Sequence, residues 1–359
     1  MTITINNKNK KPNVPNLRFK EFQGEWEYFL INDVCSEFKS GKNIKADSVF
    51  ECGEYPVYGG NGLRGYASSY NHEGSYVLIG RQGALCGNVR SVYGKTYITE
   101  HAIAVAGNEK SNTNFLHYLF LKMNLGQYSD QSAQPGLAVN KLLKLKVALP
   151  IISEQTKIAK FLSLLDERIA TQNKIIDKLQ TLIKGIAHKV SKQGKPNIRL
   201  SECLLCTSST LQESDVAEVG AYPVYGANGI VGYLDTYNTT SEAIYIIKDG
   251  SGVGAVSCVK GKCSATGTLN ILQTKEGFSL RYLYFILKVF SFEPYKTGMA
   301  IPHIYFKDYG KAKIYCPSNQ LQCKYADLLS KIEQKATAEQ KILDNLCSQK
   351  QYLLCQMFI

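Results

Sequence analysis

The sequence predicts an α+β protein with two tandem mixed α/β globules, separated by two long helices that form an antiparallel coiled coil with pseudo-twofold symmetry. Three observations lead to this prediction. A twelve-residue stretch occurs twice, the offset between its copies recurs far downstream, and a heptad pattern follows each globule.

The repeated stretch is YPVYGGNGLRGY at Tyr55 and YPVYGANGIVGY at Tyr222, 167 positions further on. The same offset places Arg81 on Lys248, Pro135 on Pro302 and Pro150 on Pro317. In the middle, Tyr118-Leu119-Phe120 matches Tyr282-Leu283-Tyr284 at an offset of 164, which predicts small compensating insertions and deletions there. We interpret the pattern as a tandem duplication of one large unit.

Composition divides each copy into a globule and a helix. The globules are rich in Gly, Tyr, Val and Ile with frequent turn signals, which predicts short strands such as 95–105, interrupted by one helix at 114–123 and another at 279–289. The predicted segments are a flexible basic arm (1–16), the first globule (17–150), the first helix (151–194), the second globule (195–317) and the second helix (318–359).

A heptad seam runs along each predicted helix. Its apolar and polar members are Ile158, Leu162, Leu165, Ile169, Gln172, Ile176, Leu179 and Ile183 in the first helix, and Leu329, Ile332, Glu339, Leu343 and Leu346 in the second. Gln172 and Glu339 are equivalent polar positions, and a polar residue in a seam can set the alignment of two helices. We therefore expect the two helices to pair with each other and to offer an interface to partners.

Charge favours a polyanionic partner, because the formal net charge is +12 and the pI is about 9.0. The chain has no apolar run long enough for a membrane span, and its N-terminus lacks a signal-peptide core, so we expect a cytoplasmic protein with no membrane partner. Eleven irregularly spaced cysteines offer no ligand pattern for a metal. No metal site is predicted.

Catalytic motifs are missing from the sequence. The glycine-rich stretches GRQGALCG and DGSGVGA lack the GK[ST] ending of a P-loop, and neither GxSxG, HExxH nor the [ND]PP[YF] motif of amino-methyltransferases occurs. The five histidines have no consistent partners across the repeat. We expect a non-catalytic chain that binds no cofactor of its own.

DNA binding fits the charge and the glycine-rich loops, whose backbone can approach a ligand closely. The candidate DNA-binding residues on these loops are Asn61, Arg64, Arg81 and Gln82 in the first globule, and Asn228, Lys248, Asp249 and Ser251 in the second. Arg and Gln suit guanine and adenine edges. Two alternatives stay open: Asn61 and Asn228 can serve turn geometry alone, and Arg81 and Lys248 can be solvated surface charges.

Together, YPVYGGNG, the loop at 80–87, QPGL, LPIISEQTKIAKFLSLLDERI and IPHIYFKDYGKAKIYCP resemble specificity subunits of Type I restriction-modification systems. The resemblance implies that each globule is a target recognition domain for one half of a split, asymmetric DNA site, and that the helices act as a spacer and dock two methyltransferase subunits. It also implies restriction subunits that translocate and cleave DNA. S-adenosylmethionine, ATP and magnesium would be bound only by those partners.

The two copies differ in one glycine-rich loop, where the second globule has DGSGVG and the first has GRQGALCG. We therefore expect the second loop to approach DNA differently. Two alternative functions remain open. One is a coiled-coil scaffold with two ligand-binding globules, and the other is an orphan or silent specificity subunit.

Overall fold

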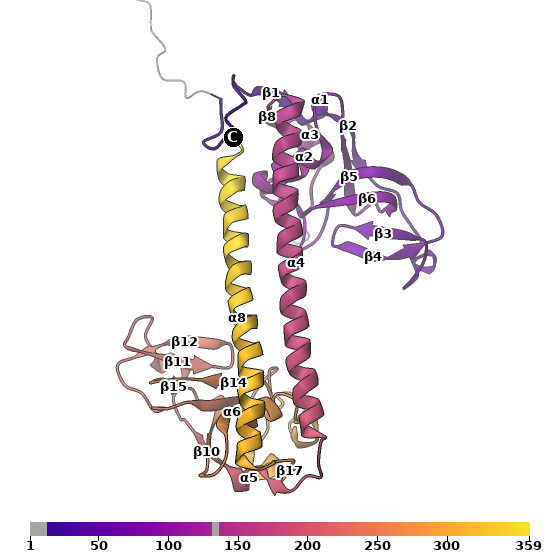
Figure 1. The fold of residues 1–359 in the computed structure, drawn as a ribbon. Helices are drawn as coiled ribbons and strands as arrows, with labels where there is room; N and C mark the ends of the chain where they lie inside the picture. Colours follow the sequence, from indigo (N-terminus) through magenta and orange to yellow (C-terminus); the bar gives the residue numbers. More distant parts are fainter. Residues whose placement is uncertain (1–12, 131–135) are drawn as a thin grey trace, which may run out of the picture. The chain divides into compact units, whose positions relative to one another are not determined.

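The computed structural model describes residues 13–130 and 136–359 and divides into two compact units (Figure 1). Unit 1 comprises Met1–Thr171 with Leu343–Ile359, and unit 2 comprises Gln172–Ile342. Most of the predicted basic arm and Pro135 of the duplicated motif lie outside the described residues. Each unit contains one globule and a part of each long helix, α4 (Ile152–Ser191) and α8 (Asn319–Gln356).

A six-stranded sheet forms the globule of unit 1. Its strands, in spatial order, are β2 (Cys35–Ser40), β7 (Ala102–Gly107), β5 (His72–Gly80), β6 (Val89–Ile98), β3 (Tyr55–Gly59) and β4 (Gly62–Ala67). All neighbours are antiparallel except β3 and β6, which run parallel. The strand predicted over 95–105 is in fact parts of two strands, because Thr99 turns the chain between β6 and β7 through a hydrogen bond that Ala102 N donates to its carbonyl at 3.0 Å.

Short elements complete unit 1 around the sheet. They are α1 (Ile31–Val34), the 3-10 turns η1 (Ala46–Ser48) and η2 (Leu125–Tyr128), α2 (Thr113–Met123), α3 (Val139–Leu143), and the antiparallel pair β1 (Glu27–Leu30) and β8 (Lys146–Leu149). Asn112 begins α2 as its N-cap, since its side chain accepts hydrogen bonds from Asn114 N at 2.9 Å and Phe115 N at 3.1 Å.

The core of unit 1 joins the globule to both long helices. Trp26, Ile158 of α4 and Phe358 beyond the end of α8 belong to the same buried cluster. The ring centroids of Trp26 and Phe358 lie 6.4 Å apart in an edge-to-face arrangement. Burial of aromatic rings is a large favourable term, so the C-terminus of the chain is part of the first globule's core.

Unit 2 repeats this architecture with shorter strands. Its four-stranded sheet, in spatial order, has β10 (Leu204–Ser208), β16 (Leu269–Thr274), β13 (Ala243–Ile247) and β14 (Val256–Val259). Its three-stranded sheet has β12 (Gly229–Leu234), β11 (Tyr222–Gly226) and β15 (Ser264–Ala265). The remaining elements are β9 (Ile198–Arg199), α5 (Leu200–Cys203), η3 (Glu213–Asp215), α6 (Leu280–Leu287), η4 (Glu293–Tyr295), α7 (Phe306–Tyr309) and β17 (Lys313–Ile314).

The hydrogen bonds at the start of α2 and α6 test the predicted change in the offset between the two copies from 167 to 164. Asn112 N donates to the Gln155 side chain at 2.8 Å, and Ser279 N donates to the Gln322 side chain at 3.0 Å. Both members of the second pair lie 167 positions after those of the first. The helices α2 and α6 therefore begin in register at the original offset. Further along the helices, Tyr118 donates to Asp166 and Tyr284 donates to the equivalent Glu333, and these two tyrosines lie 166 positions apart. The contacts thus support a shift of one residue within the helices, smaller than the predicted one.

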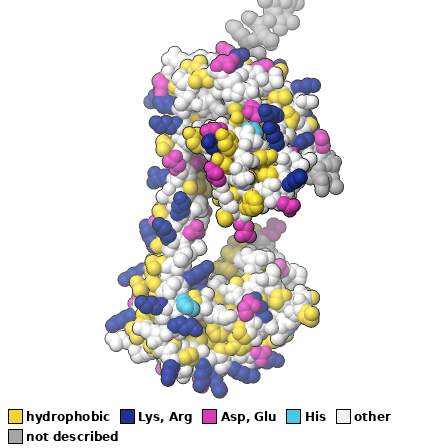
Figure 2. Space-filling model, turned by 90° about the vertical axis from the view of Figure 1, so that its right-hand side faces the viewer, with side chains coloured by type: hydrophobic (Ala, Val, Ile, Leu, Met, Phe, Trp, Pro, Cys, Tyr) yellow, Lys and Arg dark blue, Asp and Glu magenta, His cyan; other side chains and the backbone are white. Residues whose placement is uncertain are grey.

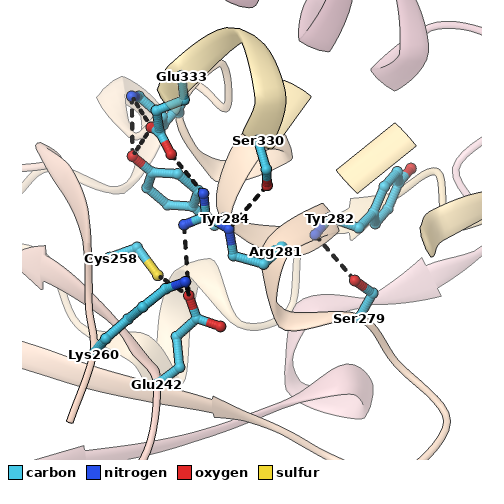
Figure 3. Close-up of polar contacts among 10 residues, drawn as sticks. Glu242, Cys258, Lys260, Ser279, Arg281, Tyr282, Tyr284, Ser330 and Glu333 are labelled. Atoms are coloured by element: carbon cyan, nitrogen blue, oxygen red, sulfur yellow. Dashed lines mark hydrogen bonds and ion pairs between the residues drawn. The ribbon is translucent and has the colours of Figure 1, made fainter. Parts of the chain in front are cut away.

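An arginine-centred network holds the globule of unit 2 against α8 (Figure 3). The Arg281 guanidinium lies 2.6 Å from the Glu333 carboxylate, donates to Ser330 at 3.2 Å and lies 3.6 Å from Glu242. Tyr284 also donates to Glu333, at 2.7 Å. Burial alone would raise the pKa of Glu333, but these donors and the nearby Lys288 ammonium hold that pKa below its usual value.

The long helices run antiparallel within each unit. In unit 2, Gln172 of α4 donates to Glu339 of α8, and Tyr325 of α8 donates to Gln193 just beyond the end of α4. Residue numbers therefore rise along one helix as they fall along the other. In unit 1, Asp166 of α4 lies 2.5 Å from Lys350 of α8. Every seam residue named from the heptads is buried or half-buried. No helix in residues 13–130 or 136–359 is both long and apolar enough to cross a membrane.

Candidate nucleic-acid interface

A turn and a loop meet in unit 1 at the edge of the sheet. The turn joins β3 to β4 and the loop follows β5. Gly60 in the turn packs against the backbone between β6 and β7, where a Cβ would lie 2.7 Å from the His101 carbonyl oxygen. Gly80, at the end of β5, packs against the turn, where a Cβ would lie 2.9 Å from the Gly60 carbonyl oxygen. Only glycine permits the second approach, which brings together the two glycine-rich motifs that the sequence singled out.

The side chains around this contact line a hollow of about 380 Å³. Three of the four predicted residues, Asn61, Arg64 and Gln82, line it, together with His101. Gln82 Oε1 and His101 Nδ1 lie 3.2 Å apart. The hollow therefore presents amide, guanidinium and imidazole groups, which suit the donor and acceptor edges of bases.

Arg81, the fourth predicted residue, does not line the hollow. Its backbone N donates to the His101 carbonyl and its own carbonyl accepts from Leu137 N, both at 2.9 Å. Its side chain is half-buried. Arg81 therefore anchors the loop through its backbone.

Sequence reasoning missed Arg90, the second residue of β6. Its guanidinium carbon lies 3.0 Å from where a Cβ of Gly62 would be, so it covers the turn, and its side chain is exposed. The search for glycine-rich loops passed over it because it lies on a strand; its place at the end of GRQGALCGNVR was the available signal. Within the described part of the chain, Arg64, Arg81 and Arg90 form no ion pair, and the side chains of Arg64 and Arg90 are exposed to solvent.

The equivalent loop of unit 2 has the same backbone hydrogen bonds. Lys248 N donates to the Thr268 carbonyl, and the Lys248 carbonyl accepts from Ile304 N, both at 2.9 Å. These bonds lie 167 positions after those of Arg81, so the two loops share these backbone contacts, and the expected difference in their approach to DNA stays a prediction. The matching side chains differ, because Val231, Lys248, Asp249 and Ser257 replace Arg64, Arg81, Gln82 and Arg90.

The turn of unit 2 carries Ala227 where unit 1 has Gly60. A groove of about 360 Å³ runs beside this turn, lined by Tyr225, Ala227, Tyr245 and Ser257 among others. None of the four predicted residues lines it: Lys248 and Asp249 are half-buried, and Asn228 and Ser251 are exposed. The predicted residues thus gather around one hollow in unit 1 and not in unit 2.

A hairpin missed by the sequence reasoning lies against the Lys248 loop. Thr297 and His303 exchange backbone hydrogen bonds at 2.9 and 2.8 Å, and Gly250 N donates to the Pro302 carbonyl at 3.0 Å. At its tip, Met299 is fully exposed and Ile301 is 66% exposed. Apolar side chains held out on a hairpin are unusual, and the run Met-Ala-Ile-Pro after Gly298 was the signal for it.

The long helices also expose apolar side chains outside the seam. Phe161 and Ile175 of α4 are 40% and 37% exposed, and Leu328 and Ile342 of α8 are 48% and 43% exposed. The last two lie 167 positions after the first two. The exposed apolar positions thus recur at equivalent places on the two helices. The heptad search missed them because it followed only the buried seam.

Charges on the visible face are mixed. Figure 2 shows Lys and Arg side chains spread over both units with carboxylates between them. On this face the positive charge is therefore dispersed and not gathered into one patch.

Comparison with known proteins assigns the same domain to both units. Residues 23–181 and 203–347 match the Type I restriction modification DNA specificity domain. The specificity subunit of the type I restriction enzyme EcoprrI from Escherichia coli is 42% identical over 154 residues, which cover 42% of this chain and 38% of that protein. A putative type I specificity subunit from Haemophilus influenzae is 28% identical over 144 residues, covering 39% of this chain and 37% of that protein. The chain thus spans less than two fifths of the length of these two relatives.

Two solved structures share the fold. The S subunit of a Type I restriction-modification system from Mycoplasma genitalium has a TM-score of 0.74 at 20% identity, covering 96% of this chain and 99% of that one. A chain from a structure concerning complex assembly and conformational transition of the type I R-M system has a TM-score of 0.52 at 16% identity, covering 92% of this chain and 96% of that one.

Proposed function

Because the chain belongs to the family of type I restriction-modification DNA specificity subunits, we propose that it selects a bipartite, asymmetric DNA site, with one globule reading each half. The observation that carries this proposal is the corner of unit 1, by which we mean the place where the β3–β4 turn (Gly60, Asn61) meets the loop after β5. Arg64 lines the hollow there with Asn61, Gln82 and His101, and Arg90 covers the turn. Neither arginine forms an ion pair within the described chain. Arginine binds guanine and phosphate, and glutamine binds adenine.

Unit 2 reads the other half-site with different side chains. Its equivalent corner has Val231, Asp249 and Ser257, which cannot make arginine contacts to guanine. The hairpin that carries Met299 and Ile301 lies against the Lys248 loop through its base, and its exposed tip takes part in the DNA contact. Lys307, whose ammonium lies 5.1 Å from the Tyr305 ring, supplies a phosphate contact. Different chemistry on a duplicated backbone accounts for an asymmetric site.

Two methyltransferase subunits dock on the paired helices, through the exposed apolar side chains of Ile175 on α4 and Ile342 on α8. Since these two positions are equivalent in the repeat, they suit two copies of one partner. Restriction subunits join the same complex. The chain itself is non-catalytic, and S-adenosylmethionine, ATP and magnesium are bound by the partners, which methylate adenine and cleave DNA.

Sequencing of modified bases tests this function. A host lacking other adenine methyltransferases is given the chain with its methyltransferase subunit, and the expected result is one split motif with methylated adenines in both halves. Exchanging residues 17–150 for those of another specificity subunit should change one half only. If methylation appears without the chain, or at a continuous motif, the proposal is wrong. If no methylation appears while the partners still assemble, the scaffold or silent-subunit alternatives are favoured.

A further inference from the structure

Two tyrosines and one lysine form the same surface cluster in both units. In unit 1 the ring centroids of Tyr55 and Tyr70 lie 5.0 Å apart, and the Lys95 ammonium lies 4.9 Å from the Tyr70 ring. In unit 2 the rings of Tyr222 and Tyr237 lie 4.9 Å apart, and the Lys262 ammonium lies 4.8 Å from the Tyr237 ring. Each member of the second cluster lies 167 positions after its counterpart.

The clusters are exposed and are held by the same backbone bonds. Tyr70 is 40% exposed and Tyr237 is 38% exposed. Asn71 N donates to the Thr96 carbonyl at 3.1 Å, and Asn238 N donates to the Cys263 carbonyl at 3.2 Å, again 167 positions on. The corner residues of the two globules differ at four positions. The duplication has therefore kept a surface feature while the proposed base-reading side chains diverged.

A surface shared by two globules that read different bases must contact something common to both. Two such candidates exist: the phosphate backbone of DNA and the two copies of the methyltransferase subunit. Carboxylates around the clusters disfavour phosphate. In unit 1, Tyr55 donates to Glu54 at 2.5 Å, and Glu73 pairs with Lys95 across the sheet. In unit 2, Asp235 accepts from Ala221 N beside Tyr222, at 3.3 Å.

The position of each cluster also separates it from the proposed DNA corner. In the β3–β4 hairpin Tyr55 pairs with Ala67 at one end, and Gly59 pairs with Gly62 at the turn. Four residues of strand separate these ends by roughly 13 Å. The hairpin of unit 2 has the same register, from Tyr222 with Leu234 to Gly226 with Gly229. In each hairpin the turn therefore lies at the proposed DNA-contacting end, and the tyrosine cluster lies at the opposite end.

We propose that the clusters Tyr55–Tyr70–Lys95 and Tyr222–Tyr237–Lys262 are equivalent docking sites, one on each globule, for the globular part of one methyltransferase subunit. This inference rests on the proposed function. Paired tyrosines in tilted or edge-to-face contact, with an adjacent cation and flanking carboxylates, have the composition of a protein interface. Such a contact holds each methyltransferase against the globule whose half-site it modifies, in addition to its contact with the helices.

The test uses the reconstituted complex of the chain with its methyltransferase subunit. Tyr70→Ala with Lys95→Ala should weaken binding of one methyltransferase copy about tenfold, so that mass photometry on dilution shows a complex with one copy where the wild type has two. Tyr237→Ala with Lys262→Ala should have the same effect on the other copy. The matched controls are Tyr93→Ala and Lys260→Ala. Tyr93 and Lys260 are both exposed and lie 167 positions apart, although their residue types differ. Either control variant should leave both methyltransferase copies bound.

Photocrosslinking gives a second readout that does not depend on truncation. A benzophenone amino acid at position 70 or 237 should crosslink to the methyltransferase, and one at position 93 should not. Unchanged affinities in both double variants, or crosslinks to DNA instead, would overturn the inference. If the wild-type chain binds no methyltransferase, the proposed function is wrong as well. If substitution of Ile175 and Ile342 abolishes methyltransferase binding while substitution of the clusters does not, only the inference is wrong.

Discussion

Gln172 donates a hydrogen bond from its side-chain amide to the backbone carbonyl of Glu339, its own equivalent in the repeat, at 3.0 Å. The same amide also donates to the Glu339 carboxylate, which forms an ion pair with Lys335. A residue meets its own equivalent only where two copies of a structure cross. Both residues are buried, at 8% and 6% exposure, so the bonds form in a largely apolar seam.

Replacing Gln172 with Leu should destabilise the helix pair, because the buried Glu339 carboxylate loses its amide donor. The double variant Gln172→Leu with Glu339→Leu should recover stability, since two apolar residues fill the seam, and should loosen the helix register. Urea denaturation followed by circular dichroism measures the stability. A single variant as stable as the wild type would contradict the prediction.

Removing the exposed arginines of unit 1 should alter the reading of one half-site only. Arg64→Ala and Arg90→Ala should each cost about 1–3 kcal/mol of binding if the arginine contacts a base, and relax the preference at one position. Competition binding with single-base variants of the methylated motif measures this. Lys20→Ala, an exposed cation of the same unit, serves as control. Loss of preference in both halves would argue against one globule per half-site.

Placing acid on the outer face of the helices should prevent docking without unfolding the chain. Ile175→Asp and Ile342→Asp together should release both methyltransferase copies, because a carboxylate cannot be buried in an apolar interface without a partner. Size-exclusion chromatography with light scattering measures the assembly. Lys174→Asp is the control for added charge. In contrast, Leu165→Asp should unfold the helix pair, since Leu165 is half-buried in the seam.

The Arg281 network should decide how firmly the second globule is held on α8. Arg281→Met keeps the aliphatic stem but removes the donor to Glu333 and Ser330, which should cost about 1–3 kcal/mol. Hydrogen exchange of α6 peptides should become faster. Lys331→Met, at an exposed position of α8, should leave the exchange unchanged. Equal exchange in both variants would show that apolar packing alone holds the globule.

Unit 1 should lose stability in mild acid because of His117. Burial, and then the nearby Lys350 ammonium, lower the pKa of His117 to about 4. In the unfolded chain a histidine pKa is about 6.5. Between these values the unfolded state binds more protons than the folded state, so stability falls as pH drops from about 6.5 to about 4. The loss should reach about 3 kcal/mol.

Fluorescence of Trp26, the single tryptophan of the chain, reports unfolding of unit 1. The urea midpoint for unfolding of unit 1 should be lower at pH 5 than at pH 7 in the wild type. In His117→Phe this decrease should be much smaller. His188→Phe, at an exposed position, should keep the wild-type dependence. An equal fall in His117→Phe would assign the pH dependence to other groups.

The amino-acid sequence by itself determined the duplication, the two long helices and their polar seam pair, because repeats and heptads are local patterns with a fixed period. It also selected Asn61, Arg64 and Gln82, since glycine-rich turns are visible in sequence. Only the tertiary structure could decide what lies around these turns. Arg90 reaches the corner across a sheet, the hairpin with Met299 lies against a loop some fifty residues earlier, and the Tyr–Tyr–Lys clusters unite three elements. Such contacts depend on strand pairing and packing between distant segments, which no periodic pattern encodes.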